Sequence, residues 1–187
     1  MVSETVAWIH RAARARRIEE PVDRDEELLL AVLNSAPVVD GRREDRLAGA
    51  SGRQLARTWG GTGTAAELER LRRARDAIQA VVRGGGAAPP AVEELAAVVD
   101  GAVRTPRVSA DGVAWELSAP RDDRLPVEAV LAWSSVAARL PGRLRPCAND
   151  ECELFLVDHS RPGTARWCSM STCGNRMKAR AHAQRTR

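Results

Sequence analysis

Four cysteines in the last quarter of the 187-residue chain are the residues whose type and spacing could do chemistry. They form two pairs: four residues lie within each pair, and fifteen residues separate the pairs. Two close pairs joined by a short insert can surround one tetrahedral ion, and four thiolates form the closed, soft ligand shell that suits Zn²⁺. We therefore predict a structural zinc site with the ligands Cys147, Cys152, Cys168 and Cys173.

Two disulfides are the main alternative to a metal. The first residues of the sequence do not resemble a secretory signal, so we expect a cytoplasmic protein, in which disulfides are rare. A mixed site that uses His159 or His182 is a second alternative. Because four cysteines already complete the shell, we expect both histidines at the surface instead.

Charge is distributed unevenly along the chain. Residues 141–187 hold nine Arg or Lys and four Asp or Glu, whereas residues 1–140 hold 20 basic and 21 acidic residues. No acidic residue follows Asp158, but seven basic residues do. This shift, together with the cysteines and Pro141-Gly142, predicts a domain boundary near residue 141, with domains over 1–140 and 141–187.

The basic end of the chain could bind nucleic acid, because counterions are released when cationic side chains meet phosphates. A solvated tail is the alternative. On a helical wheel Arg176 and Arg180 lie on one side and Lys178 and Arg185 on another, which favours general phosphate contact over reading of bases. The residues that we predict to contact nucleic acid are Arg161, Arg166, Arg176, Lys178, Arg180 and Arg185.

Helical patterns dominate the region before the cysteines. Thr64 and Glu67 have the spacing of a capping box, and apolar residues such as Leu68, Leu71 and Ile78 then fall on one face. Residues 35–63 give no clear pattern. The predicted helices are Glu4–Glu19, one after Asp23 that carries Leu28 to Leu33, a turn at Gln54–Trp59, Thr64–Arg83, Pro90–Val99 and Val127–Leu140.

One β-hairpin is predicted from Arg107–Ala110 and Val113–Ser118, joined by Asp111-Gly112, a pair that accepts positive φ. Val113, Trp115 and Leu117 alternate onto one face. We expect these side chains, and nearly all apolar residues of the helices, including Val92 and Ala137, to lie in the core.

The insert between the cysteine pairs fits a small finger. Leu154–Val157 is predicted to pair with Thr164–Trp167, and a helix from about Ser171 to Gln184 places Cys173, Met177 and Ala181 on one face. Such a unit of about 45 residues cannot bury enough apolar surface alone, so metal binding should accompany folding. The expected class is α+β, mainly α: a helical N-terminal domain with a small hairpin, then a treble-clef-like zinc finger.

These residues resemble a known family. The runs Cys147–Cys152, Phe155–Asp158, Ser160-Arg161, Arg166–Met170 and Cys173–Lys178 together resemble the CGNR-type zinc finger of bacterial proteins. Members commonly carry an N-terminal ABATE domain, regarded as a putative stress-induced transcription regulator, and residues 1–140 resemble that domain more loosely.

The resemblance implies the four cysteines as metal ligands and gives a meaning to the run that names the family. Gly174 would permit close approach of the backbone to the thiolates, and Asn175 could hydrogen-bond the loop between Cys147 and Cys152. Two roles stay open for Arg176: bracing Asp158 or contacting a phosphate.

The function expected from the residues and the resemblance is a zinc-stabilised transcription regulator that contacts DNA rather than RNA. A finger that binds a protein partner is the alternative. We expect no enzyme, because P-loop, dinucleotide-binding and nucleophile-elbow motifs are lacking and a four-thiolate shell offers no open position for water. No membrane association is expected, and a small-molecule ligand for residues 1–140 stays open.

Overall fold

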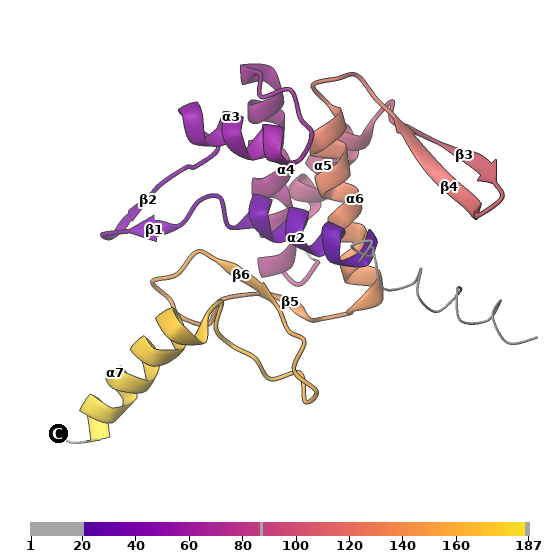
Figure 1. Ribbon diagram of the computed structural model, residues 1–187. Helices are drawn as coiled ribbons and strands as arrows, with labels where there is room; N and C mark the ends of the chain where they lie inside the picture. The colour runs from indigo at the N-terminus through magenta and orange to yellow at the C-terminus, as the bar shows by residue number, and fades with distance from the viewer. Residues whose placement is uncertain (1–20, 87, 186–187) are drawn as a thin grey trace, which may run out of the picture.

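The computed structural model describes residues 21–86 and 88–185 (Figure 1). The helix predicted over Glu4–Glu19 lies outside these residues. A bundle of helices forms the body of the molecule, in which α2 and α4 both pack against α6, and α5 packs against α4. The helices of this body are α2 (Pro21–Leu33), α3 (Gly49–Thr58), α4 (Ala65–Arg83), α5 (Pro89–Val99) and α6 (Arg124–Arg139).

Aliphatic side chains make up the core, because the chain has one Phe and no Tyr. Leu29, Leu33, Leu71 and Ile78 are fully buried between the helices, as their spacing predicts. The expectation of burial is wrong for Val92 of α5 and for Ala137 of α6, which are exposed. In each of these helices other residues face the core, which are Leu95 of α5 and Val127, Val130 and Val136 of α6.

The start of α4 confirms half of the predicted capping box. The hydroxyl of Thr64 accepts the backbone N–H of Glu67 at 3.1 Å. The carboxylate of Glu67, however, accepts the backbone N–H groups of Thr62 at 3.0 Å and Gly63 at 2.6 Å. The loop before α4 is therefore folded around a buried carboxylate, and Gly61 is needed there because a Cβ would lie 2.7 Å from the Glu67 oxygens.

The buried side chain of Arg75 organises the start of residues 35–63, the segment without a clear sequence pattern. The guanidinium of Arg75 on α4 contacts both carboxylate oxygens of Asp45, at 2.7 and 3.1 Å, and the hydroxyl of Ser35 at 3.2 Å. These contacts hold a short antiparallel pair against the body, formed by β1 (Val38–Val39) and β2 (Arg42–Arg43). The pKa of Asp45 is lowered because the contacts with Arg75 outweigh the effect of burial.

The predicted hairpin is present, but its turn is shifted. Strands β3 (Val103–Ser109) and β4 (Gly112–Ser118) pair antiparallel, with Ser109 opposite Gly112. The two loop residues are therefore Ala110 and Asp111 rather than Asp111-Gly112. The hairpin stands away from the helices (Figure 1), and Val113 and Trp115 are exposed, so their expected place in the core is wrong.

The finger contains a strand pair, although its partners differ from the predicted ones. β6 (Phe155–Val157) pairs antiparallel with β5 (Leu144–Pro146), and not with Thr164–Trp167. The segment after β6 instead turns around the carboxylate of Asp158, which accepts the backbone N–H groups of Ser160 and Ala165. Only one backbone bond, from Ala148 N–H to the Arg166 carbonyl at 2.8 Å, ties this segment to the first cysteine pair.

The end of the chain is helical, as predicted. A π-helical turn, η1 (Met170–Gly174), leads into α7 (Asn175–Arg185). Cys173 is buried, Met177 is half-buried and Ala181 is exposed, so the expected apolar face does not continue along the helix. The α+β, mainly helical class is confirmed, and the treble-clef arrangement stays a prediction. None of the helices in the described part of the chain has the length and apolarity to cross a bilayer.

Candidate metal centre and basic surface

The four predicted ligands come together in space. Cys147 follows β5, Cys152 ends the adjacent loop, Cys168 precedes η1, and Cys173 lies within it. Their sulfur atoms all lie within 4.8 Å of one another, and none of them forms a disulfide. The structure thus brings residues 26 positions apart in the sequence into one cluster of thiols, in which neither His159 nor His182 takes part.

The spacing of the sulfur atoms fits a tetrahedral ion. Zinc–sulfur bonds of about 2.3 Å place two ligands of a tetrahedron about 3.8 Å apart. The Sγ atoms of Cys152 and Cys168 are 3.7 Å apart, as are those of Cys168 and Cys173. The four thiols therefore form a site that suits a metal ion, and their softness favours zinc.

Hydrogen bonds around the cluster orient two of the sulfur atoms. The side-chain amide of Asn149 lies 3.5 Å from Cys173 Sγ, and the backbone N–H of Cys168 lies 3.5 Å from Cys147 Sγ. Asn149 is itself buried, and its Oδ1 faces the backbone N–H of Glu151 at 3.4 Å. Such donors stabilise negative charge on thiolates and fix the ligands in place. Asn149 lies within the Cys147–Cys152 loop, and no spacing pattern in the sequence predicts its contact with Cys173.

Without a metal, the pKa values of three of the thiols are shifted in different directions. Burial raises the pKa of Cys152 to about 11 and also raises the pKa of Cys168. The pKa of Cys173 is lowered, because the amide of Asn149 and the neighbouring thiols outweigh the effect of burial. Cys173 is therefore more easily deprotonated than Cys152 and Cys168, and a metal must displace protons from those two thiols when it binds.

Gly174 packs closely against two side chains beside the cluster. A Cβ at this position would lie 2.8 Å from Met170 Sδ and 3.3 Å from Trp167 Cδ1. Gly174 also donates its N–H to the Ser169 carbonyl at 2.9 Å, which closes η1. The atoms nearest to a Cβ at this position belong to Met170 and Trp167 and not to a cysteine, so the expected close approach to the thiolates stays a prediction.

Asp158 is braced by two arginines, but Arg176 is not one of them. Oδ2 of the buried Asp158 carboxylate lies 3.2 Å from a guanidinium nitrogen of Arg145 and 3.6 Å from one of Arg143. The hydroxyl of Ser160 donates to the same carboxylate at 2.6 Å, and this hydrogen bond is the main reason why the pKa of Asp158 is lowered. Of the two roles left open for Arg176, bracing of Asp158 is therefore excluded. The side-chain amide of Asn175 donates to the Ser171 carbonyl of η1 at 3.5 Å rather than to the cysteine loop.

The predicted basic residues fall into two groups. Arg161 and Arg166 lie in the segment between Asp158 and Cys168, and the guanidinium of Arg166 lies 5.2 Å from the centre of the Trp167 ring. The other four share α7, where they are exposed, and that helix projects away from the body (Figure 1). These four are Arg176, Lys178, Arg180 and Arg185.

One of these cations has an acidic partner that the sequence analysis missed. Arg180 contacts both carboxylate oxygens of Glu151, at 2.7 and 2.6 Å. No acidic residue follows Asp158 in the sequence, but the cluster of cysteines brings the Cys147–Cys152 loop, with Glu151, next to α7. Within the described residues, no carboxylate pairs with Arg161, Arg176, Lys178 or Arg185.

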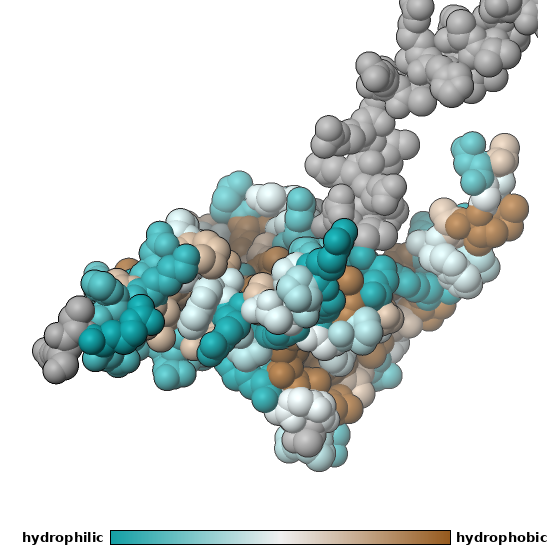
Figure 2. All heavy atoms as spheres, turned by 90° about the horizontal axis from the view of Figure 1, so that it is seen from below, coloured by the Kyte–Doolittle hydropathy of each residue, from teal (hydrophilic) through white to brown (hydrophobic). Residues whose placement is uncertain are grey.

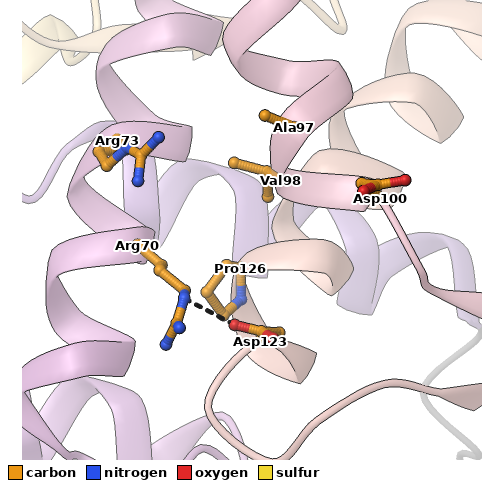
Figure 3. A pocket seen from close by; sticks show the side chains of 7 residues that line it. All are labelled: Arg70, Arg73, Ala97, Val98, Asp100, Asp123 and Pro126. Carbon is orange, nitrogen blue, oxygen red and sulfur yellow. Dashed lines mark ion pairs between the residues drawn. The ribbon is translucent and has the colours of Figure 1, made fainter.

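A small hollow lies within the helical body. It has a volume of about 120 Å³ and lies between α4, α5 and the start of α6 (Figure 3). Arg70 forms an ion pair with Asp123 at 2.7 Å across it, and Arg73 forms one with Glu94 at 2.6 Å. The arginines are therefore already neutralised, and the hollow gives no sign of a ligand for residues 1–140.

Comparison with known proteins agrees with the geometry of the cluster. Residues 143–186 match the model of the CGNR zinc finger family. This segment contains the four cysteines, Asn149, Asp158 and all of α7, but the match does not extend into the helical body. No protein with curated annotation matches the chain. The ABATE-like assignment of the helical body therefore stays a prediction.

Proposed function

We propose that this chain is a zinc-stabilised nucleic-acid-binding protein, a transcription regulator that contacts DNA through the basic surface of its finger. The observation that carries the proposal is the exposure and the charge of α7. This helix has no buried residue and carries no acidic side chain, and among the described elements its extensive contacts are with η1. A helix that is polar all round and stands away from the body is suited to lie against a charged partner.

The charges that support DNA contact are those without an acidic neighbour. Arg176, Lys178 and Arg185 on α7, together with Arg161 in the preceding loop, are exposed. Space-filling spheres at this end of the molecule are largely hydrophilic (Figure 2). Phosphates would release counterions on meeting these side chains, so affinity would depend on salt and little on sequence. Arg180 contributes less in this proposal, because Glu151 already neutralises it.

In this proposal the metal has a structural role and the protein is not an enzyme. Four thiolates fill the coordination shell of zinc and leave no position for a water or a substrate. The cluster instead holds η1 and the Cys147–Cys152 loop together, and through η1 it fixes the start of α7. The metal thus positions the cations that bind.

The test is a salt titration of binding to labelled random duplex DNA, followed by fluorescence anisotropy, with the double variant Arg176→Ala/Lys178→Ala. If both residues contact phosphates, the log–log salt slope of about −0.9 per contact should become shallower by up to about 2 units. The matched control is Arg53→Ala/Arg57→Ala on α3, which also removes two exposed charges. Its slope should equal that of the wild type, and zinc content should be unchanged in both variants.

Two outcomes would contradict the proposal. Absence of measurable affinity for duplex DNA at low salt would favour a finger that binds a protein partner. Equal salt slopes for the wild type and the α7 variant would exclude this surface as the contact, even if binding occurred. Tighter binding to single-stranded RNA than to duplex DNA, measured in parallel, would shift the proposal from DNA to RNA.

A further inference from the structure

The backbone and the side chain of Arg166 are both held in place. The guanidinium lies 5.2 Å from the centre of the Trp167 ring, within the range of a cation–π contact. The preceding residue, Ala165, donates its N–H to the buried Asp158 carboxylate at 3.1 Å. The carbonyl of Arg166 accepts the N–H of Ala148 at 2.8 Å. Arg166 therefore extends from a loop that is tied both to Asp158 and to the first cysteine pair.

The ring that supports Arg166 is itself packed against the start of the basic helix. Trp167 Cδ1 lies 3.3 Å from the position of a Cβ at Gly174, and Cys168 joins the metal cluster directly after Trp167. Arg176, in the first turn of α7, follows Gly174 by two residues. The contact between Arg166 and Trp167 thus lies beside the helix that carries the proposed phosphate contacts.

The guanidinium of Arg166 keeps its hydrogen-bond donors free. The side chain is exposed, and in the described residues 21–86 and 88–185 it forms no ion pair or hydrogen bond. A contact with an aromatic ring leaves the five N–H donors of a guanidinium available to oxygen and nitrogen acceptors. Arg180, by contrast, already donates to the carboxylate of Glu151.

A guanidinium that is held in place and has free donors suits the recognition of a base. Contacts to phosphates fix a protein on a duplex but carry no sequence information, which comes from the edges of the bases. Arginine donates two hydrogen bonds to O6 and N7 of guanine in the major groove, and this is the commonest specific contact to DNA. A side chain that is already ordered loses less rotamer freedom when it binds.

Arg161 lies in the same loop but lacks this support. Its side chain is exposed and has no hydrogen bond, ion pair or ring contact within the described part of the chain. A flexible cation of this kind can follow a phosphate but does not present its donors in a fixed plane. The two arginines of the loop are therefore suited to different contacts.

We propose that Arg166 reads a guanine in the major groove of duplex DNA, whereas Arg161 and the cations of α7 contact phosphates. This inference rests on the proposed function and adds a base preference to it. Most of the affinity comes from phosphates, and one position of the bound duplex is selected by Arg166.

Selection of bound sequences from a random duplex library by the zinc-loaded full chain tests the inference. Sequencing should show a guanine enriched at one position, and a duplex with that guanine should bind about fivefold or more tightly than one with adenine there. Arg166→Lys keeps the charge but lacks the planar fork, so the enrichment should disappear while the salt slope stays that of the wild type. Arg161→Lys is the matched control and should enrich the same guanine as the wild type.

A modified base tests the contact from the side of the DNA. Replacement of the selected guanine by 7-deazaguanine removes the N7 acceptor in the major groove and leaves the minor groove unchanged, so the wild type should lose most of its preference. The Arg166→Lys protein should bind both duplexes equally.

The outcomes separate this inference from the function on which it rests. Binding to random duplexes without an enriched base would overturn the inference and leave the proposed function standing. A guanine preference that Arg166→Lys retains, or that 7-deazaguanine does not reduce, would also overturn it. Absence of binding to every duplex would contradict the proposed function and the inference together.

Discussion

The side chain of Asn34 pairs with the backbone of Phe155 as a neighbouring strand would. Its Nδ2 donates to the Phe155 carbonyl at 3.1 Å, and its Oδ1 accepts the Phe155 N–H at 2.7 Å. The ring of Phe155 is buried in the core of the helical body, and the guanidinium of Arg83 lies 4.8 Å from its centre. Arg83 also forms an ion pair with Glu153. These contacts fasten the finger to the end of α2 and to α4.

Loss of this pairing should weaken the whole protein. Asn34→Ala leaves the N–H and the carbonyl of Phe155 without partners in a buried place, which should lower the free energy of unfolding by about 2 kcal/mol. Urea denaturation followed by circular dichroism measures the change. The control is Gln54→Ala, which removes an exposed amide from α3 and should have little effect. An Asn34→Ala protein as stable as the control would show that the pairing contributes nothing.

Zinc should be present at about one ion per chain in the purified protein, as measured by elemental analysis. Cys173→Ser should lose the metal, and residues 147–152 and 166–185 should become sensitive to protease. β6 should stay protected, because Phe155 remains in the core of the body. Thr172→Ala, next to the ligand but exposed, is the control. Zinc retained at full stoichiometry by Cys173→Ser would show that this cysteine is not a ligand.

Asn149 should tune the affinity for the metal. Asn149→Ala removes the amide that faces Cys173 Sγ, and zinc affinity should fall about 10- to 100-fold in competition with a chelator. Asn149→Asp keeps the oxygen that faces the Glu151 N–H but adds a negative charge beside the thiolate, so we expect a larger loss. If both variants bind zinc as tightly as the wild type, the amide does not act on the ligand.

Asp158 should make the finger sensitive to acid. Its pKa is lower in the folded state than in the unfolded chain, so its stabilising effect is complete above the unfolded pKa of about 4 and is lost as pH falls through the folded pKa. Asp158→Asn should melt several degrees below the wild type at pH 7, and the gap should narrow below about pH 4. Because acid also displaces the metal from both proteins, the difference between the two melting temperatures is the quantity to follow. A gap that is independent of pH would contradict this role.

The pair between Glu151 and Arg180 gives a prediction that rests on the proposed DNA contact. Glu151→Gln releases Arg180, and if this side chain then reaches a phosphate, the salt slope of DNA binding should steepen by up to about 0.9. Glu153→Gln is the matched control, because it removes the same charge nearby and releases Arg83 instead. Identical slopes for the two variants would show that Arg180 does not reach DNA.

Local patterns in the sequence were enough to predict the elements that depend on local interactions. Thr64–Arg83 has a cap and an apolar stripe, and the structure contains α4 at almost the same bounds. The gathering of the cysteines followed from their pairing along the chain. The position of Asp158 in the sequence does not predict its partners. The two arginines that form ion pairs with it are Arg145 of β5 and Arg143 just before that strand, and no spacing rule connects these arginines with Asp158.

The predictions that are wrong concern contacts between segments that lie far apart in the sequence. Alternation in β4 predicts that one face is buried, but alternation only sorts side chains onto two faces and does not provide an element to cover one of them. Likewise, the insert between the cysteine pairs does not supply the strand partner of β6, which is Leu144–Pro146. Phe155 in the helical core and Glu151 beside α7 are positions that depend on how the finger docks, which a single sequence does not encode locally.

Anchoring of Phe155 also changes the entropy of closing the metal loop. Fifteen residues separate Cys152 from Cys168, and Phe155 divides them into segments of two and twelve. A chain already held at that point has less freedom to lose when the four sulfur atoms converge. The helical body therefore pre-organises the ligands, and the full chain should hold zinc more tightly than an excised finger with the same four cysteines.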